Sequence, residues 1–155
     1  MPITFEALMT EFCQATGIRD NADIEAIIGG APLNIDGVAI TVRHAAGIAP
    51  DRLSIYCDFG IPPQAQRAKV YSRILEVNLA GYELDLGVFG TSPDSGRIIL
   101  ATRFSLGTMT VESLREVLAH LVERGKAFGL SYRRTEADPA QVRRGLSAPA
   151  SLNRR

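Results

Sequence analysis

The sequence predicts an α+β domain whose elements follow the order α-β-β-β-α-β-β-α. Apolar side chains recur at helical spacing in three segments, and the segments between them are short apolar or alternating runs bounded by turn residues. A length of 155 residues suits one globular domain, and no repeat of fixed period appears. We expect this domain to span residues 1–132, followed by a basic, disordered tail over residues 133–155.

The first predicted helix covers residues 5–16. Thr4 is suited to cap its start and Gly17 to end it. Its apolar positions at helical spacing are Phe5, Leu8, Met9 and Phe12. Two interpretations stay open for this stripe: it packs in the core, or it receives the apolar side chains of a partner. We expect the polar stretch 19–23 that follows to be a connecting segment outside regular secondary structure.

Two predicted strands, 33–35 and 38–42, flank the dipeptide Asp36-Gly37. Such a pair between apolar runs is a strong hairpin signal, because both positions of the tight turn need a positive φ. A third strand is expected over residues 53–59, where apolar and polar residues alternate. Cys57 falls on its apolar face and is expected to be a small buried side chain.

The second predicted helix, residues 64–80, carries two apolar stripes, and a small sheet can cover only one of them. One stripe comprises Ala68, Tyr71, Leu75 and Leu79, and the other Val70, Ile74 and Val77. The remaining stripe favours a two-fold contact with a second copy. We assign that contact to Val70, Tyr71, Ile74 and Val77, with Tyr71, Leu75 and Leu79 as the alternative set.

Two further strands are expected over 84–90 and 97–104, joined by the turn-rich segment 91–96. A last amphipathic helix starts after Thr110, its predicted cap, and continues toward Phe128 or Tyr132.

Charge and composition exclude several classes of protein. The net charge is zero, but the tail carries +4 and the first 132 residues carry −4. An acidic body argues against nucleic acid as the main partner. No apolar run approaches the ~18 residues of a membrane span, and no secretory signal is visible. Two cysteines suit a reducing cytoplasm rather than a disulfide framework.

No motif predicts catalysis, a metal or a cofactor. The segment 90–96 has the wrong glycine spacing for a phosphate loop, and His44 and His120 stand apart without ligands at metal spacing. We therefore expect a protein that binds another polypeptide rather than an enzyme. A small enzyme or ligand-binding domain is the rival class, and it requires a polar pocket with converging titratable groups.

Four stretches resemble the Tir-chaperone family of bacterial type III secretion. Residues 74–79 (Ile-Leu-Glu-Val-Asn-Leu) resemble its second-helix motif Leu-Leu-Glu-x-Asn-Leu. Residues 87–90 and 94–100 resemble its glycine-containing strand, turn and following strand, and residues 33–37 its early hairpin. The resemblance covers about residues 4–132. The last helix lacks the tryptophan common in the family, and the basic tail extends past the usual end.

The resemblance implies a twisted antiparallel sheet with three helices and a homodimer formed through the second helix. It also implies a cytoplasmic chaperone, without cofactor, that holds the N-terminal segment of a secreted effector in extended form. The secretion ATPase is a further candidate partner. We assign effector contacts to Phe5, Leu8, Phe12, Ile40 and Val42, with core packing as the alternative for all five. A regulatory or scaffold module on the same fold is the alternative function.

Overall fold

The computed structural model describes residues 3–127, which form a five-stranded sheet and four α-helices. The helices are α1 (Phe5–Ala15), α2 (Asn21–Ile28), α3 (Arg67–Gly81) and α4 (Val111–Ala127). The strands are β1 (Leu33–Ile35), β2 (Val38–His44), β3 (Arg52–Gly60), β4 (Val88–Thr91) and β5 (Ile98–Ser105). The tail predicted over 133–155 and the last residues of the predicted domain lie outside the described residues.

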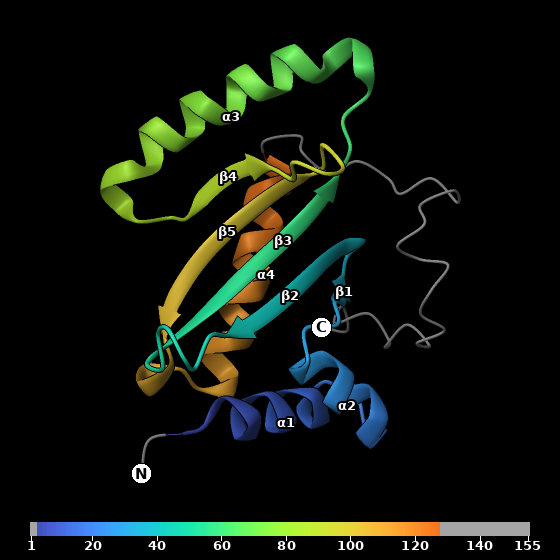
Figure 1. Cartoon of the computed structure of the whole chain (residues 1–155), viewed down its shortest axis with the longest axis vertical. Helices are drawn as coiled ribbons and strands as arrows, with labels where there is room; N and C mark the ends of the chain where they lie inside the picture. The colour runs from blue at the N-terminus through green and yellow to red at the C-terminus, as the bar shows by residue number, and fades with distance from the viewer. Residues whose placement is uncertain (1–2, 128–155) are drawn as a thin grey trace.

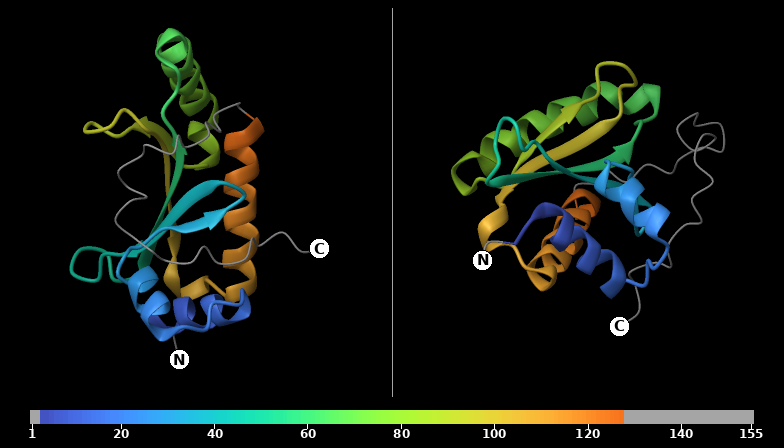
Figure 2. Two further views of the ribbon diagram at one scale, coloured as in Figure 1. Left: turned by 90° about the vertical axis from the view of Figure 1, so that its right-hand side faces the viewer. Right: turned by 60° about the horizontal axis from the view of Figure 1, so that its bottom comes forward.

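All strands are antiparallel and lie in the order β1-β2-β3-β5-β4 (Figure 1). The predicted α+β class is confirmed. Helix α4 lies along one face of the sheet, and α3 stands beside the edge strand β4 (Figure 2). One ladder row crosses the core face from Ile40 through Cys57 and Leu100 to Phe89, and all four side chains are buried. The sheet therefore builds the core from segments far apart in the chain.

The predicted turn chemistry is confirmed at the first hairpin. Asp36 and Gly37 have φ angles of 51° and 82°, the left-handed pair that a two-residue hairpin turn requires. Lys126 on α4 donates to the Asp36 carboxylate at 3.1 Å. This ion pair joins the hairpin to the last helix, and it raises the pKa of Lys126.

The N-terminal region holds one helix more than the sequence predicts. Thr4 caps α1 as expected, since its hydroxyl accepts from the Ala7 amide at 3.2 Å. The stretch expected to be a polar joint contains the start of α2, which Asp20 caps by accepting from the Ala22 amide at 2.8 Å. Ile24 and Ile27 anchor the helix in the core. The expectation was wrong because α2 is short and its apolar stripe has only a few members.

The segment before β4 also differs from the prediction. A strand was expected from Leu84, but residues Tyr82–Leu84 form a 3-10 turn and β4 begins at Val88. Asp85 turns the chain in the left-handed region at φ 47°. Gly87 follows at φ 84° and lies so close to β5 that a Cβ there would approach the Ala101 carbonyl oxygen to 2.7 Å. Contact with β5 thus shapes this segment.

Helix α4 approaches the sheet closely at Gly125. A Cβ built on Gly125 would overlap the ring of Phe59, which is buried on β3. We expect Gly125→Ala to lower the free energy of unfolding by about 1–3 kcal/mol, because overpacking outweighs the better helix propensity of alanine. Urea denaturation measures the change. Gly47→Ala is the control, since a Cβ there meets nothing within 4 Å; equal stability of the two variants would contradict this packing.

Candidate functional site

Asn78 attaches α3 to the edge of the sheet. Its side-chain amide donates to the Phe89 carbonyl oxygen at 2.8 Å, and its side-chain oxygen accepts from the Phe89 amide at 2.8 Å. Phe89 lies in β4, whose other edge pairs with β5. One side chain therefore satisfies both backbone groups that the edge strand turns away from its neighbour.

Arg124 braces the same region from α4. Its guanidinium donates to the Leu86 carbonyl oxygen and lies 5.2 Å from the centre of the Phe89 ring, in cation–π geometry. A Cβ on Gly81 would lie 3.4 Å from Arg124 Nη2, so the end of α3 also packs against this side chain. Burial lowers the pKa of Arg124. Helix α3 is thus held from β4 and from α4.

Held in this way, α3 presents large apolar side chains to solvent. Leu75 is 69% exposed, Leu79 80%, Tyr82 82% and Leu84 68%. Leu75 and Leu79 lie one turn apart on α3, and Tyr82 and Leu84 continue the row into the 3-10 turn that follows. We call these four residues the apolar strip. Exposed apolar surface of this kind is typical of sites that bind proteins.

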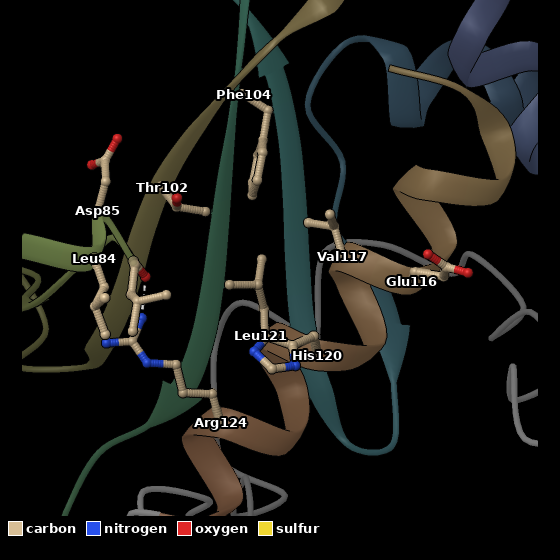
Figure 3. A pocket seen from close by; sticks show the side chains of 10 residues that line it. Leu84, Asp85, Thr102, Phe104, Glu116, Val117, His120, Leu121 and Arg124 are labelled. Atoms are coloured by element: carbon tan, nitrogen blue, oxygen red, sulfur yellow. Dashed lines mark hydrogen bonds between the residues drawn. The ribbon is translucent and has the colours of Figure 1, made fainter. Parts of the chain in front are cut away.

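The apolar strip leads to a cavity of about 520 Å³ between α4, β5 and the segment before β4 (Figure 3). Its lining is mainly apolar, with Leu84, Leu86, Phe104, Val117 and Leu121 as the large side chains. Polar groups stand around it: those of Asp85, Thr102, Glu116, His120 and Arg124. An apolar hollow with a polar rim is suited to an apolar side chain of a bound polypeptide.

The residues assigned to a contact between two copies differ in their exposure to solvent. Val70 and Ile74 are buried at 9% and 4% exposure, and Tyr71 and Val77 are partly buried against the same core. These four residues face their own chain. Of the alternative set, Leu75 and Leu79 are exposed. A single chain does not test the contact itself, which stays a prediction.

The five residues assigned to effector contacts all lie in the core. Phe5, Leu8 and Phe12 on α1, and Ile40 and Val42 on β2, are each at most 3% exposed. These positions match the alternative interpretation, packing in the core, because α1 turns its apolar stripe inward toward α4. Their role in effector binding stays a prediction.

The two cysteines and His44 do not line the cavity, whose titratable lining residues are Asp85, Glu116, His120 and Arg124. Burial raises the pKa of Cys13 to about 11 and that of Cys57 to about 12, so both thiols are protonated at neutral pH. His44 bonds the Pro50 carbonyl oxygen at 2.9 Å, and no group of three or more metal-ligating side chains occurs among residues 3–127. Within that range no helix is both long and apolar enough to cross a membrane.

The chain matches the model of a known protein family over most of its length. The profile of the Tir chaperone protein (CesT) family matches residues 8–128. The chain belongs to this family. No curated protein sequence matches the chain significantly.

Several solved structures of low sequence identity share the fold. The ExsC–ExsE complex aligns with a TM-score of 0.61 at 20% identity, covering 83% of this chain and 94% of that chain. The HopA1–SchA chaperone–effector complex aligns at 0.56 and 18% identity, covering 80% and 91%. The Yersinia pestis type III secretion chaperone SycH, in complex with a stable fragment of YscM2, aligns at 0.52 and 18% identity, covering 81% and 99%.

Sequence reasoning missed the side chains that hold the site together. Asn78 belongs to the stretch 74–79 on which the resemblance rests, yet its role depends on Phe89, eleven residues further along. Arg124 lies on the predicted last helix, and only its charge distinguished it. Two signals were available for Asn78: its match to the asparagine of the family motif, and its polar side chain on a helix with two apolar stripes.

We expect Asn78→Ala to lower the free energy of unfolding by about 2 kcal/mol, since two hydrogen bonds are lost and two backbone groups lose their partner. Hydrogen exchange of the Phe89 amide should accelerate more than that of Leu100 in the next strand. Asn21→Ala is the control, because Asn21 is exposed at the start of α2. An unchanged exchange rate of the Phe89 amide would contradict the two hydrogen bonds between Asn78 and the Phe89 backbone.

Proposed function

We propose that this protein is a homodimeric type III secretion chaperone that binds the N-terminal segment of an effector in extended form and keeps it competent for secretion. The observation that carries the proposal is the apolar strip running into a 520 Å³ apolar cavity. Family membership supplies the class of activity, and this surface supplies a place for it.

An extended client has no core of its own to offset the entropy lost on ordering, so its chaperone must supply apolar contacts along its length. The cavity lies beside β5 and α4 and is open enough to receive large side chains from such a segment. Its polar rim would bond the backbone of the client next to each inserted side chain. These features support an extended polypeptide as the ligand.

The apolar strip supports a contact between two copies. In a two-fold contact the same surface meets itself, so a row of apolar side chains on one helix packs against the same row on the other. Leu75 and Leu79 are suited to this role because they are one turn apart and exposed. Tyr71 and Val77, which are partly buried, would flank the contact.

The proposal includes a bacterial cytoplasmic location, no catalytic activity and the secretion ATPase as a second partner. Membership in a chaperone family supports the first two. Contact with the ATPase rests on the family resemblance alone.

Replacement of Leu75 and Leu79 together by Asp should convert a dimer to a soluble monomer of 16.8 kDa, because charge would be buried in the contact. Light scattering coupled to size exclusion measures the mass. Both sites are exposed in the single chain, so the thermal melt should change little. Lys69→Asp with Arg73→Asp, at the same spacing elsewhere on α3, is the control. A dimer that survives the Leu75 and Leu79 changes would move the contact away from the strip.

Val117→Phe should fill part of the cavity and weaken effector capture about tenfold, while the thermal melt stays near that of the unchanged protein. Val117 lines the cavity and is only partly buried, so the larger ring has room. Val111→Phe, on the same helix and away from the cavity, is the control. Capture unaffected by Val117→Phe would exclude the cavity as an effector site.

Co-expression with type III effectors, followed by purification and mass measurement, tests the function itself. The expected product is a complex of two chaperone chains with one effector chain, in which the N-terminal segment of the effector resists proteolysis. Capture of folded proteins only, with no protected N-terminal segment, would favour the regulatory or scaffold alternative.

A further inference from the structure

The face of the sheet opposite α4 carries a group of positive charges. Side chains alternate along β3, so Leu53 and Ile55 are buried while Arg52 is exposed and Ser54 half-buried on the other side. Ser54 pairs with Arg43 on β2 and with Arg103 on β5, and both arginines are exposed. Three arginines thus surround one serine.

The register of β3 and β5 places Arg52 and Arg103 close together. Arg52 pairs with Ser105, and Ser54 pairs with Arg103, so Arg52 and Arg103 are diagonal neighbours roughly 7–8 Å apart. Like charges at this distance on one face repel each other. A bound anion would relieve the repulsion.

The two arginines border a hollow of about 270 Å³ on this face. Ser54 and Tyr56 contribute hydroxyl groups to its lining, and Ala101 and Val88 contribute apolar surface. Asp85 also lines the hollow. The site therefore combines hydroxyl groups and two guanidinium groups with one carboxylate and a small apolar floor.

Carboxylates of the described residues offset only part of this charge, because Asp85 brings one negative charge to the hollow against the two positive charges of Arg52 and Arg103. Arg52 approaches only Asp51, at 4.0 Å, with both side chains more than half exposed (53% and 76%), a pair that contributes little in water. Arg43 extends its guanidinium over Gly30, and neither Arg43 nor Arg103 forms an ion pair within residues 3–127. The first 132 residues carry a net charge of −4, so this positive face stands out from its surroundings.

We propose that the hollow bordered by Arg52 and Arg103 binds a carboxylate of an acidic, extended segment of the secreted client, with Arg43 as an outer cation. The inference rests on the proposed function, and it adds a charge-selective site on the face opposite α4. Guanidinium groups bind carboxylates by paired, charge-assisted hydrogen bonds, and the flat sheet face accepts a chain lying across it. Tyr56 and Val88 contact the apolar side chains that alternate with the acidic ones.

Fluorescence anisotropy with the full chain tests this site. The probes are two labelled peptides of about 12 residues with extended backbones, one alternating Glu and Thr and one alternating Gln and Thr. The Glu–Thr peptide should bind about tenfold more tightly, and added salt should remove the difference. Arg52→Gln combined with Arg103→Gln should abolish the preference and also weaken capture of co-expressed effectors.

Matched variants separate the site from charge in general. Arg19→Gln with Arg115→Gln makes the same change in net charge at exposed positions elsewhere and should keep the preference. Replacement of the six tail arginines by Gln should also keep it. The tail residues concerned are Arg133, Arg134, Arg143, Arg144, Arg154 and Arg155.

Three results would overturn the inference. The first is equal affinity for both peptides, and the second is loss of the preference when the tail arginines are replaced. The third is a double variant, Arg52→Gln with Arg103→Gln, that is monomeric while the unsubstituted protein is dimeric. The last result would make this face part of the contact between copies. Failure of the proposed function would give a different result: the protein without substitutions would capture no effector.

Discussion

The bond between Asn78 and the backbone of Phe89 is the contact on which the binding surface depends. Strand β4 is an edge strand, and its outward N–H and C=O groups need partners or they invite another chain. Asn78 satisfies both groups and, by the same bonds, holds α3 beside the sheet. Arg124 reinforces this arrangement from the other side of Phe89. Together with the buried side chains of Val70 and Ile74, these contacts fix the position from which α3 presents Leu75 and Leu79.

The short segment before β4 connects the two proposed sites. Asp85 lines both the apolar cavity and the basic hollow, and its left-handed backbone places it between them. Gly87 lets the chain lie against β5. Thr102 of β5 lines both hollows, as Asp85 does, so the two hollows share a wall. A client that reached from one to the other would meet an apolar site on one side of this wall and a cationic site on the other. The proposed selectivity thus combines shape with charge.

Local signals predicted most of the fold. Asp36-Gly37 specified the hairpin because few dipeptides adopt its backbone, and Thr4 specified a helix start because its hydroxyl reaches an amide in the first turn. Helix α2 was missed because eight residues carry too little periodicity. The start of β4 was misplaced because Leu84, Leu86 and Val88 alternate as in a strand, whereas the chain forms a 3-10 turn at Tyr82–Leu84 and turns again at Asp85.

The sequence by itself predicted two apolar stripes on the second long helix, and it offered no positive argument for catalysis. Only the tertiary structure decided which stripe is exposed: α3 contacts β4 and buries Val70 and Ile74, which leaves Leu75 and Leu79 in solvent. Periodicity shows that a helix has two faces, but the side that is covered depends on strands far along the chain. The same limit applies to α1, whose stripe turned inward, and to Arg52 and Arg103, which only the register of β3 and β5 brings together.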